Sequence, residues 1–150
     1  MGQDNSIRKH LLDGRLTILS VIRPSGILSS ALAWDGKNLW SCDAQARKIY
    51  RHLPDENLTV IATYDFPGKS PVGMVWLGRD LWVGDEGTGT LYRLSFEKEV
   101  FTLAESLRPG VHLPGTNKLS GLCSDGKNIW TVSEGNGLIF RHSLSKLRGG

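Results

Sequence analysis

Acidic side chains recur at three related points of this 150-residue sequence. Asp43, the pair Asp85 and Glu86, and Glu134 each follow a short apolar run that contains a tryptophan, and Asn136 lies just after Glu134. If these residues meet at the mouth of a shared channel, their carboxylate and amide oxygens could bind a divalent cation, or one carboxylate could act as a general base. Asp and Asn are also ordinary turn residues, so the same pattern has a purely structural interpretation.

A long loop at 107–119 carries the second group of candidates. Its sequence, LRPGVHLPGTNKL, is longer than the corresponding segments IRPSGILS and FPGKSPV. Extra length in one loop of a repeat array is where binding specificity is often located. His112 could act as a general base or a metal ligand, and Lys118 could contact a ligand.

The alternative for His112 is an ordinary solvent-exposed loop residue. No second His or Cys lies at ligand spacing in this loop, so the sequence does not predict a metal site there. The candidate ligand-binding residues are Asp43, Asp85, Glu86, His112, Lys118, Glu134 and Asn136.

The two cysteines, Cys42 and Cys123, are too few for a disulfide framework. Both fall within expected strands, and we therefore expect buried, reduced thiols. The sequence contains no motif that pairs a nucleophile with a base. Enzymatic activity is therefore neither predicted nor excluded.

A repeat positions these side chains. The segments ALAWDGKNLWSCDAQARKIYRHL, GMVWLGRDLWVGDEGTGTLYRL and GLCSDGKNIWTVSEGNGLIFRHSL align with one another. Trp40, Trp82 and Trp130 fall at one position, with spacings of 42 and 48 residues, and an aromatic residue followed by Arg comes ten residues later. Periods of this length are typical of β-propellers, in which each blade is a four-stranded antiparallel sheet.

The turn residues place the strands within each repeat. Asp35-Gly36 and Asp125-Gly126 are the residues that tight hairpins favour, and the flanking runs are apolar. Segments rich in β-branched and aromatic types follow as fourth strands at 58–64 and 101–104. We expect an all-β chain with an outermost strand at 16–24, blade 1 at 27–66, blade 2 at 71–106 and blade 3 at 119–144. An N-terminal extension at 1–15 and a C-terminal tail at 145–150 flank these blades.

The repeat also resembles known families. The string GLCSDGKNIWTV, with an aromatic residue and Arg ten residues after its Trp, resembles the blades of glutamine cyclotransferase-like, streptogramin lyase-like and gluconolactonase-like propellers over 16–144. The resemblance implies the propeller fold. Because these motifs encode blade structure and occur in families with different chemistry, no catalytic residue carries over.

The strand inventory predicts how a ring could close. Residues 16–22, LTILSVI, align with 58–64, LTVIATY, so an outermost strand precedes blade 1, whereas blade 3 ends after its third strand. Three blades do not close a ring, since propellers typically have four to eight. We therefore expect a homodimer that forms one six-bladed ring, in which 16–22 of each copy completes blade 3 of the other.

One further match complicates this expectation. Residues 7–13 resemble 49–55, as though a third strand preceded the outermost strand. Either 7–13 are displaced onto the surface of the dimer, or the chain is a fragment of a longer propeller.

Composition narrows the range of partners. The 18 basic and 15 acidic residues give a net charge of +3, and the basic residues are scattered, so we expect no nucleic-acid partner. No apolar run is long enough to span a membrane, and the polar start lacks the features of a secretory signal. We therefore expect no membrane association and a cytoplasmic location.

Two functional hypotheses remain. The first is a binding or scaffolding propeller with a small molecule at the channel mouth. The second is a small-molecule hydrolase, lyase or transferase that uses Glu86 or Glu134 together with His112, with a divalent cation as a possible cofactor.

Overall fold

The computed structural model describes residues 4–112 and 117–147, which form antiparallel sheets and one short helix. β1 (Ile7–His10) and β2 (Ile18–Ile22) form a hairpin. Blade 1 has the order β3 (Ser29–Trp34), β4 (Leu39–Asp43), β5 (Lys48–His52) and β6 (Val60–Asp65). Blade 2 has the order β7 (Pro71–Leu77), β8 (Asp80–Asp85), β9 (Thr90–Glu97) and β10 (Val100–Leu107).

Blade 3 has three strands among the described residues. They are β11 (Lys118–Ser124), β12 (Asn128–Glu134) and β13 (Ile139–Ser143), followed by α1 (Leu144–Leu147). The predicted all-β class and the four-stranded antiparallel sheets are confirmed. The turn of helix at α1 was not expected, because the sequence predicted an irregular tail from 145.

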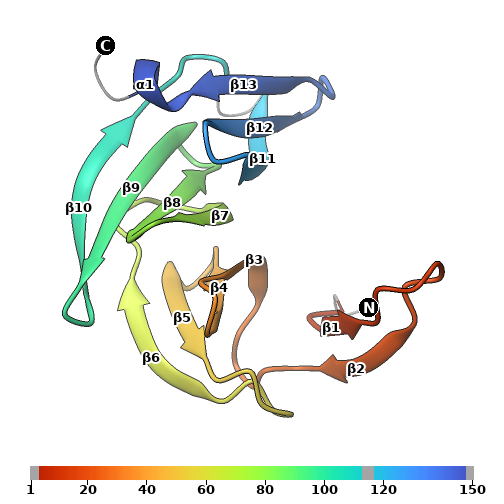
Figure 1. Cartoon of the computed structure of the whole chain (residues 1–150). Helices are drawn as coiled ribbons and strands as arrows, with labels where there is room; N and C mark the ends of the chain where they lie inside the picture. The colour runs from red at the N-terminus through yellow and green to blue at the C-terminus, as the bar shows by residue number, and fades with distance from the viewer. Residues whose placement is uncertain (1–3, 113–116, 148–150) are drawn as a thin grey trace.

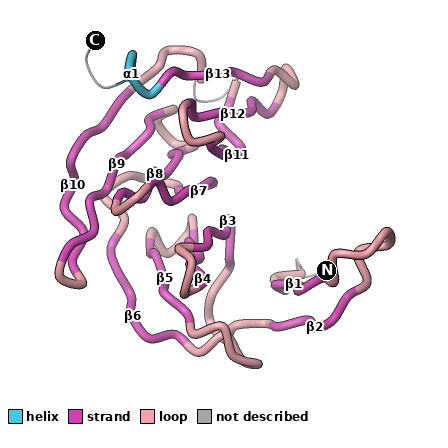
Figure 2. The backbone as a smooth tube through the Cα atoms, viewed as in Figure 1, coloured by secondary structure: helices cyan, strands magenta, loops and turns pink. Residues whose placement is uncertain are grey.

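The blades lie side by side along an arc (Figures 1 and 2). The first strands β3, β7 and β11 neighbour one another on the inner side, whereas β6 and β10 lie on the outer side. The arc is open between blade 3 and the β1–β2 hairpin (Figure 1). Each blade therefore has one neighbour on each side, except at this opening.

Tryptophans from the second strands fill the spaces between blades. Trp40 is fully buried between blades 1 and 2, where its ring lies 5.8 Å from Tyr64, 5.1 Å from Trp76 and 5.4 Å from Phe96. Trp82 is likewise buried between blades 2 and 3, in a cluster with Leu91, Leu119 and Ile129. Burial of side chains this large is worth roughly 2–3 kcal/mol each, with some additional gain from the ring geometry.

The hairpin turns of blades 1 and 3 orient the tryptophans of these blades. In blade 1 the Asp35 carboxylate accepts a hydrogen bond from the indole Nε1–H of the blade's tryptophan at 2.7 Å, and Asp125 does the same in blade 3 at 2.9 Å. Blade 2 has Leu77 at this position, and the Nε1 of Trp82 is buried without a hydrogen-bond partner among the described residues.

The β1–β2 hairpin reproduces the β5–β6 hairpin in detail. His10 Nδ1 lies 2.6 Å from the carbonyl oxygen six residues later, and His52 Nδ1 makes the same contact at 2.8 Å. Asp13 and Asp55 each accept hydrogen bonds from the N–H and hydroxyl of the threonine four residues later. Residues 7–10 of the predicted extension therefore form the third strand of a blade-like hairpin.

The two cysteines differ in environment. Cys42 is buried as predicted, and burial raises the pKa of its thiol to about 11. Cys123 is exposed, so the prediction that it is buried is wrong. The physical reason is that Cys123 shares a face of blade 3 with its cross-strand partner Trp130, and no other sheet of the described chain covers that face.

Gly89 permits a close contact between blade 2 and the loop that leads into blade 3. It has φ +68, and a Cβ added there would lie 2.1 Å from the carbonyl oxygen of His112. Gly78 has φ +63 but open space around it, which makes it a matched control.

We expect Gly78→Ala to lower the free energy of unfolding by about 1 kcal/mol and Gly89→Ala by about 3 kcal/mol or more, measured by urea unfolding. Equal losses for the two variants would contradict this packing.

Candidate functional site

Asp43 and Asp85 are buried in the turns between the second and third strands of their blades. Asp43 accepts three hydrogen bonds from backbone N–H groups, and Asp85 accepts three from backbone N–H groups and one from a hydroxyl, all at 2.8 to 3.0 Å. The donors are Leu28, Gln45 and Ala46 for Asp43, and Lys69, Ser70, Gly87 and Thr88 for Asp85. Each carboxylate ties its turn to the loop that enters the blade, so the structural interpretation accounts for both residues.

The other acidic candidates are more exposed and belong to blades 2 and 3. Lys118 Nζ lies 3.6 Å from Glu86 Oε1, an ion pair that joins the turn of blade 2 to β11. Glu134 is exposed and is the register partner of Lys118 across β11 and β12. We call Glu86, Lys118 and Glu134 the mouth cluster. Asn136 is not included, because its side chain stabilises a turn: its Oδ1 accepts a hydrogen bond from the N–H of Leu138 at 2.9 Å.

His112 is 1% exposed, so its interpretation as a solvent-exposed loop residue is wrong. Its Nε2 lies 2.6 Å from Thr131 Oγ1 and its Nδ1 lies 3.1 Å from Ser133 Oγ. Thr131 Oγ1 also lies 2.9 Å from the Nε2 of His142. We call these four residues the histidine network. Part of the loop that follows His112, 113–116, lies outside the described residues.

The hydrogen bonds assign a direction to the histidine network. The Ser133 hydroxyl donates to the carbonyl oxygen of Asn117 at 3.2 Å, so it accepts from the Nδ1–H of His112. The Nε2 of His112 then accepts the hydroxyl proton of Thr131, whose oxygen accepts from the Nε2–H of His142. This arrangement requires a neutral imidazole at His112 and a proton on the Nε2 of His142.

The electrostatics agree with neutral rings. Burial lowers the pKa of His112 below its ordinary value. Burial also lowers the pKa of His142, and the neighbouring His112 lowers it further. Enclosed and neutral, the network can hold the loop against blade 3, but it does not present a base to a ligand in solvent.

The sequence contained a signal for this network that sequence reasoning missed. Ser133 occupies the repeat position of Asp43 and Asp85. A blade that lacks this carboxylate needs another group to hold its entering loop, and His112 supplies that group. In blade 1, Ser41 Oγ lies 2.8 Å from the Nε2 of His52, at the positions equivalent to Thr131 and His142.

Residues 4–112 and 117–147 contain neither a metal-binding cluster nor a helix that could span a membrane. In these ranges no three His, Cys, Asp or Glu side chains converge in a way that could hold a metal ion. The same ranges contain no helix of the length and apolarity that a membrane crossing needs.

Comparison with known proteins gives matches in fold. No model of a known protein family and no curated protein matches the sequence. A catalytically inactive variant of virginiamycin B lyase from Staphylococcus aureus, solved with quinupristin, matches with a TM-score of 0.62, 20% identity, 95% of this chain and 46% of its own. The glutaminyl cyclase of Myxococcus xanthus matches with a TM-score of 0.63, 17% identity, 84% of this chain and 52% of its own.

A third match is a domain of a different kind. The WD40 β-propeller domain of Doa1 matches with a TM-score of 0.61 and 17% identity, over 97% of this chain and 46% of that domain. The chain has the β-propeller fold. It spans about half the length of these three propellers. At such identities the likeness concerns the fold alone and brings no activity with it.

The histidine network predicts a pH dependence of stability. Because the folded state lowers the pKa of His112 and His142, the unfolded chain binds their protons more readily. The stability that the neutral rings contribute is therefore present above the unfolded pKa of about 6.5 and lost as the pH falls toward the lower folded values. Urea unfolding between about pH 7.5 and 5 should show this decline, and the double variant His112→Asn with His142→Asn should show a smaller one. An equal decline in both proteins would contradict the assignment.

Proposed function

We propose that this protein is a binding or scaffolding propeller that acts as a closed six-bladed ring of two copies, with a small molecule at its mouth. The observation that carries the proposal is the exposure of apolar side chains at the two ends of the arc, at positions that are buried within it.

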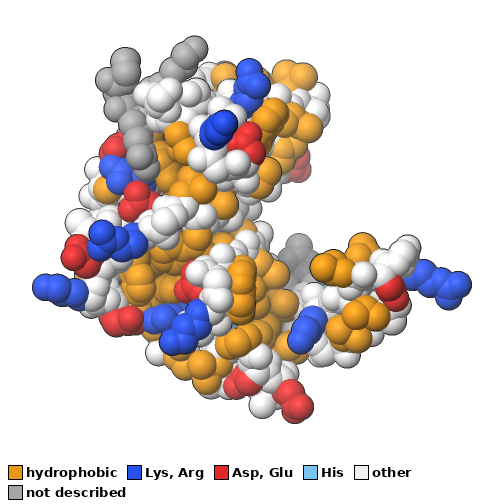
Figure 3. All heavy atoms as spheres, in the orientation of Figure 1, with side chains coloured by type: hydrophobic (Ala, Val, Ile, Leu, Met, Phe, Trp, Pro, Cys, Tyr) orange, Lys and Arg blue, Asp and Glu red, His pale blue; other side chains and the backbone are white. Residues whose placement is uncertain are grey.

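Equivalent positions of the repeat differ sharply in exposure. Ile139 of blade 3 is 69% exposed, whereas the equivalent Ile49 and Leu91 are 0% exposed. At the other end Leu32 is 44% exposed, and the equivalent Met74 is 5% exposed. Hydrophobic side chains reach the surface on both sides of the opening (Figure 3). Apolar surface of this kind favours association, and a second copy offers both of the surfaces that are needed.

Strand sequences support closure by exchange. In a ring of two copies, β13 of one copy would pair with β2 of the other. β13 reads IFRH, and the equivalent strands of blades 1 and 2 read IYRH and LYRL. β1, which lies against β2 in the single chain, reads IRKH and lacks the aromatic residue. Closure requires β1 to leave this edge, and its poorer match to the repeat favours that replacement.

The mouth cluster supports a ligand-binding role over catalysis. Two copies would place two sets of Glu86, Lys118 and Glu134 around one axis, a mixed-charge surface suited to a small polar molecule. The catalytic alternative has less support, because it pairs Glu86 or Glu134 with His112, and the His112 side chain is enclosed.

Solution mass tests the proposed ring. Light scattering on the untagged 16.5 kDa chain should give a mass near twice that value, with dissociation on dilution. A mass of one chain at every concentration would contradict the ring of two copies.

A further inference from the structure

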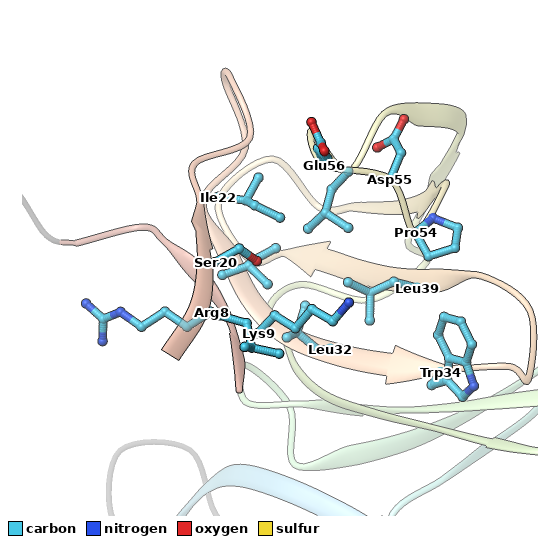
Figure 4. A pocket seen from close by; sticks show the side chains of 13 residues that line it. Arg8, Lys9, Ser20, Ile22, Leu32, Trp34, Leu39, Pro54, Asp55 and Glu56 are labelled. Carbon is cyan, nitrogen blue, oxygen red and sulfur yellow. The ribbon is translucent and has the colours of Figure 1, made fainter. Parts of the chain in front are cut away.

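An apolar groove of about 870 Å³ lies between the β1–β2 hairpin and blade 1 (Figure 4). Ile22 and Lys9 line it on the hairpin side, and Leu32, Trp34 and Leu39 line it on the side of blade 1. Trp34 is 53% exposed, so a large aromatic surface faces this space.

The groove is the repeat equivalent of the site that holds Trp40. The Trp40 ring lies against Tyr64 and Trp76, in a cluster with Met74 and Leu81, and Arg51 lies over it with its guanidinium carbon 5.5 Å from the ring centroid. Forty-two residues earlier in the sequence, these five positions are Ile22, Trp34, Leu32, Leu39 and Lys9. The groove therefore has the walls of a tryptophan site, Trp34 among them, but no tryptophan of the described chain takes the place that Trp40 has in the equivalent site.

Blade 3 carries a tryptophan that lacks such a site. Trp130 is the repeat equivalent of Trp40 and Trp82, which are both 0% exposed, yet Trp130 remains partly exposed on the open face of blade 3. Arg141 lies over its ring, with the guanidinium carbon 5.8 Å from the centroid, as Arg51 does over Trp40. Trp130 and Arg141 therefore have the same arrangement as Trp40 and Arg51, and Trp130 could pack against a neighbouring blade in the same way.

We propose that the groove binds a second copy of this chain, and that Trp130 of that copy is the side chain that occupies it. This inference rests on the proposed function and names its contact surface. The indole packs against Trp34, Leu32 and Leu39 as Trp40 packs against their equivalents in blade 2. The contact occurs twice in the dimer, once for each pairing of blade 3 with the groove.

The strand register gives the same arrangement. β1 pairs with β2 as β5 pairs with β6, including Ile7 opposite Ile22 and Ile49 opposite Tyr64. Ile139 is the repeat equivalent of Ile7, so β13 of the second copy aligns with β2 with Ile139 opposite Ile22. That alignment covers the 69% exposed Ile139 and brings Arg141 to the place of Lys9. β1 is thus the strand that holds this edge in the single chain.

Two variants with opposite defects test the proposal. Trp130→Ala removes the inserted side chain, and Leu32→Trp fills the groove from its exposed wall. Each should raise the dissociation constant of the homodimer at least about tenfold, measured by light scattering on dilution, because both contacts of the dimer lose one partner. The matched control is Leu103→Ala, an exposed apolar truncation on β10, which should leave the constant unchanged.

A mixture of the two variants makes the test specific. A heterodimer of Trp130→Ala with Leu32→Trp retains one intact contact, whereas each homodimer retains none. Native mass spectrometry of the mixture should therefore show heterodimer at concentrations where neither variant forms homodimer. Formation of the heterodimer depends only on which contact surfaces are intact. Circular dichroism is the control that both variants are folded.

The outcomes separate this inference from the proposed function. A wild-type dimer that both variants leave unchanged would overturn the tryptophan contact while the ring of two copies stands. Weakening by Trp130→Ala alone, without heterodimer in the mixture, would place Trp130 against another surface and overturn the groove as its site. A wild-type chain that stays monomeric would overturn the proposed function and this inference together.

Discussion

Burial of a tryptophan between neighbouring blades is the interaction on which this structure depends. Trp40 and Trp82 are fully buried, and each lies in a cluster that two blades build together. A single four-stranded sheet covers only one side of an aromatic side chain, so each blade needs its neighbour to bury its tryptophan. Stability is therefore shared along the arc. The two end faces lack the neighbouring blade that covers each face in the middle of the arc. The exposed side chains of Leu32 and Ile139 are the direct result.

Buried polar residues fix the loop that enters each blade. In blades 1 and 2 a buried carboxylate fastens the entering loop, and in blade 3 the shorter Ser133 leaves that place to His112. Neutral imidazoles suit the position because they donate and accept at once without the cost of a buried charge. The acidic candidates that are not held by backbone N–H groups in this way are Glu86, which pairs with Lys118, and the exposed Glu134.

The repeat made the fold predictable, and departures from the repeat limited the prediction of the site. The tryptophan spacing and the Asp-Gly turns specify blades because each encodes a local structure that recurs. The burial of His112 was not predicted, since it depends on the single substitution at Ser133 and on a contact between distant segments. Cys123 was predicted to be buried because it lies in an expected strand and Cys is among the most buried residue types. Its exposure depends on which sheets neighbour that face, and local sequence does not encode this.

The pairing of β13 with β2 of a second copy is the central claim, and an engineered disulfide tests it most directly. Val21 lies opposite Arg8 in the hairpin, and Phe140 is the repeat equivalent of Arg8, so Cys at 21 of one copy and at 140 of another should lie within disulfide distance. Within one chain β2 and β13 lie on opposite sides of the opening, so only a link between copies can form (Figure 1). With Cys123→Ser in both chains, mixing Val21→Cys and Phe140→Cys under mild oxidation should give a covalent heterodimer. Pairing Val21→Cys with Leu103→Cys should give none. Failure of the first pair to cross-link, in folded chains at concentrations where the wild type is dimeric, would contradict strand exchange.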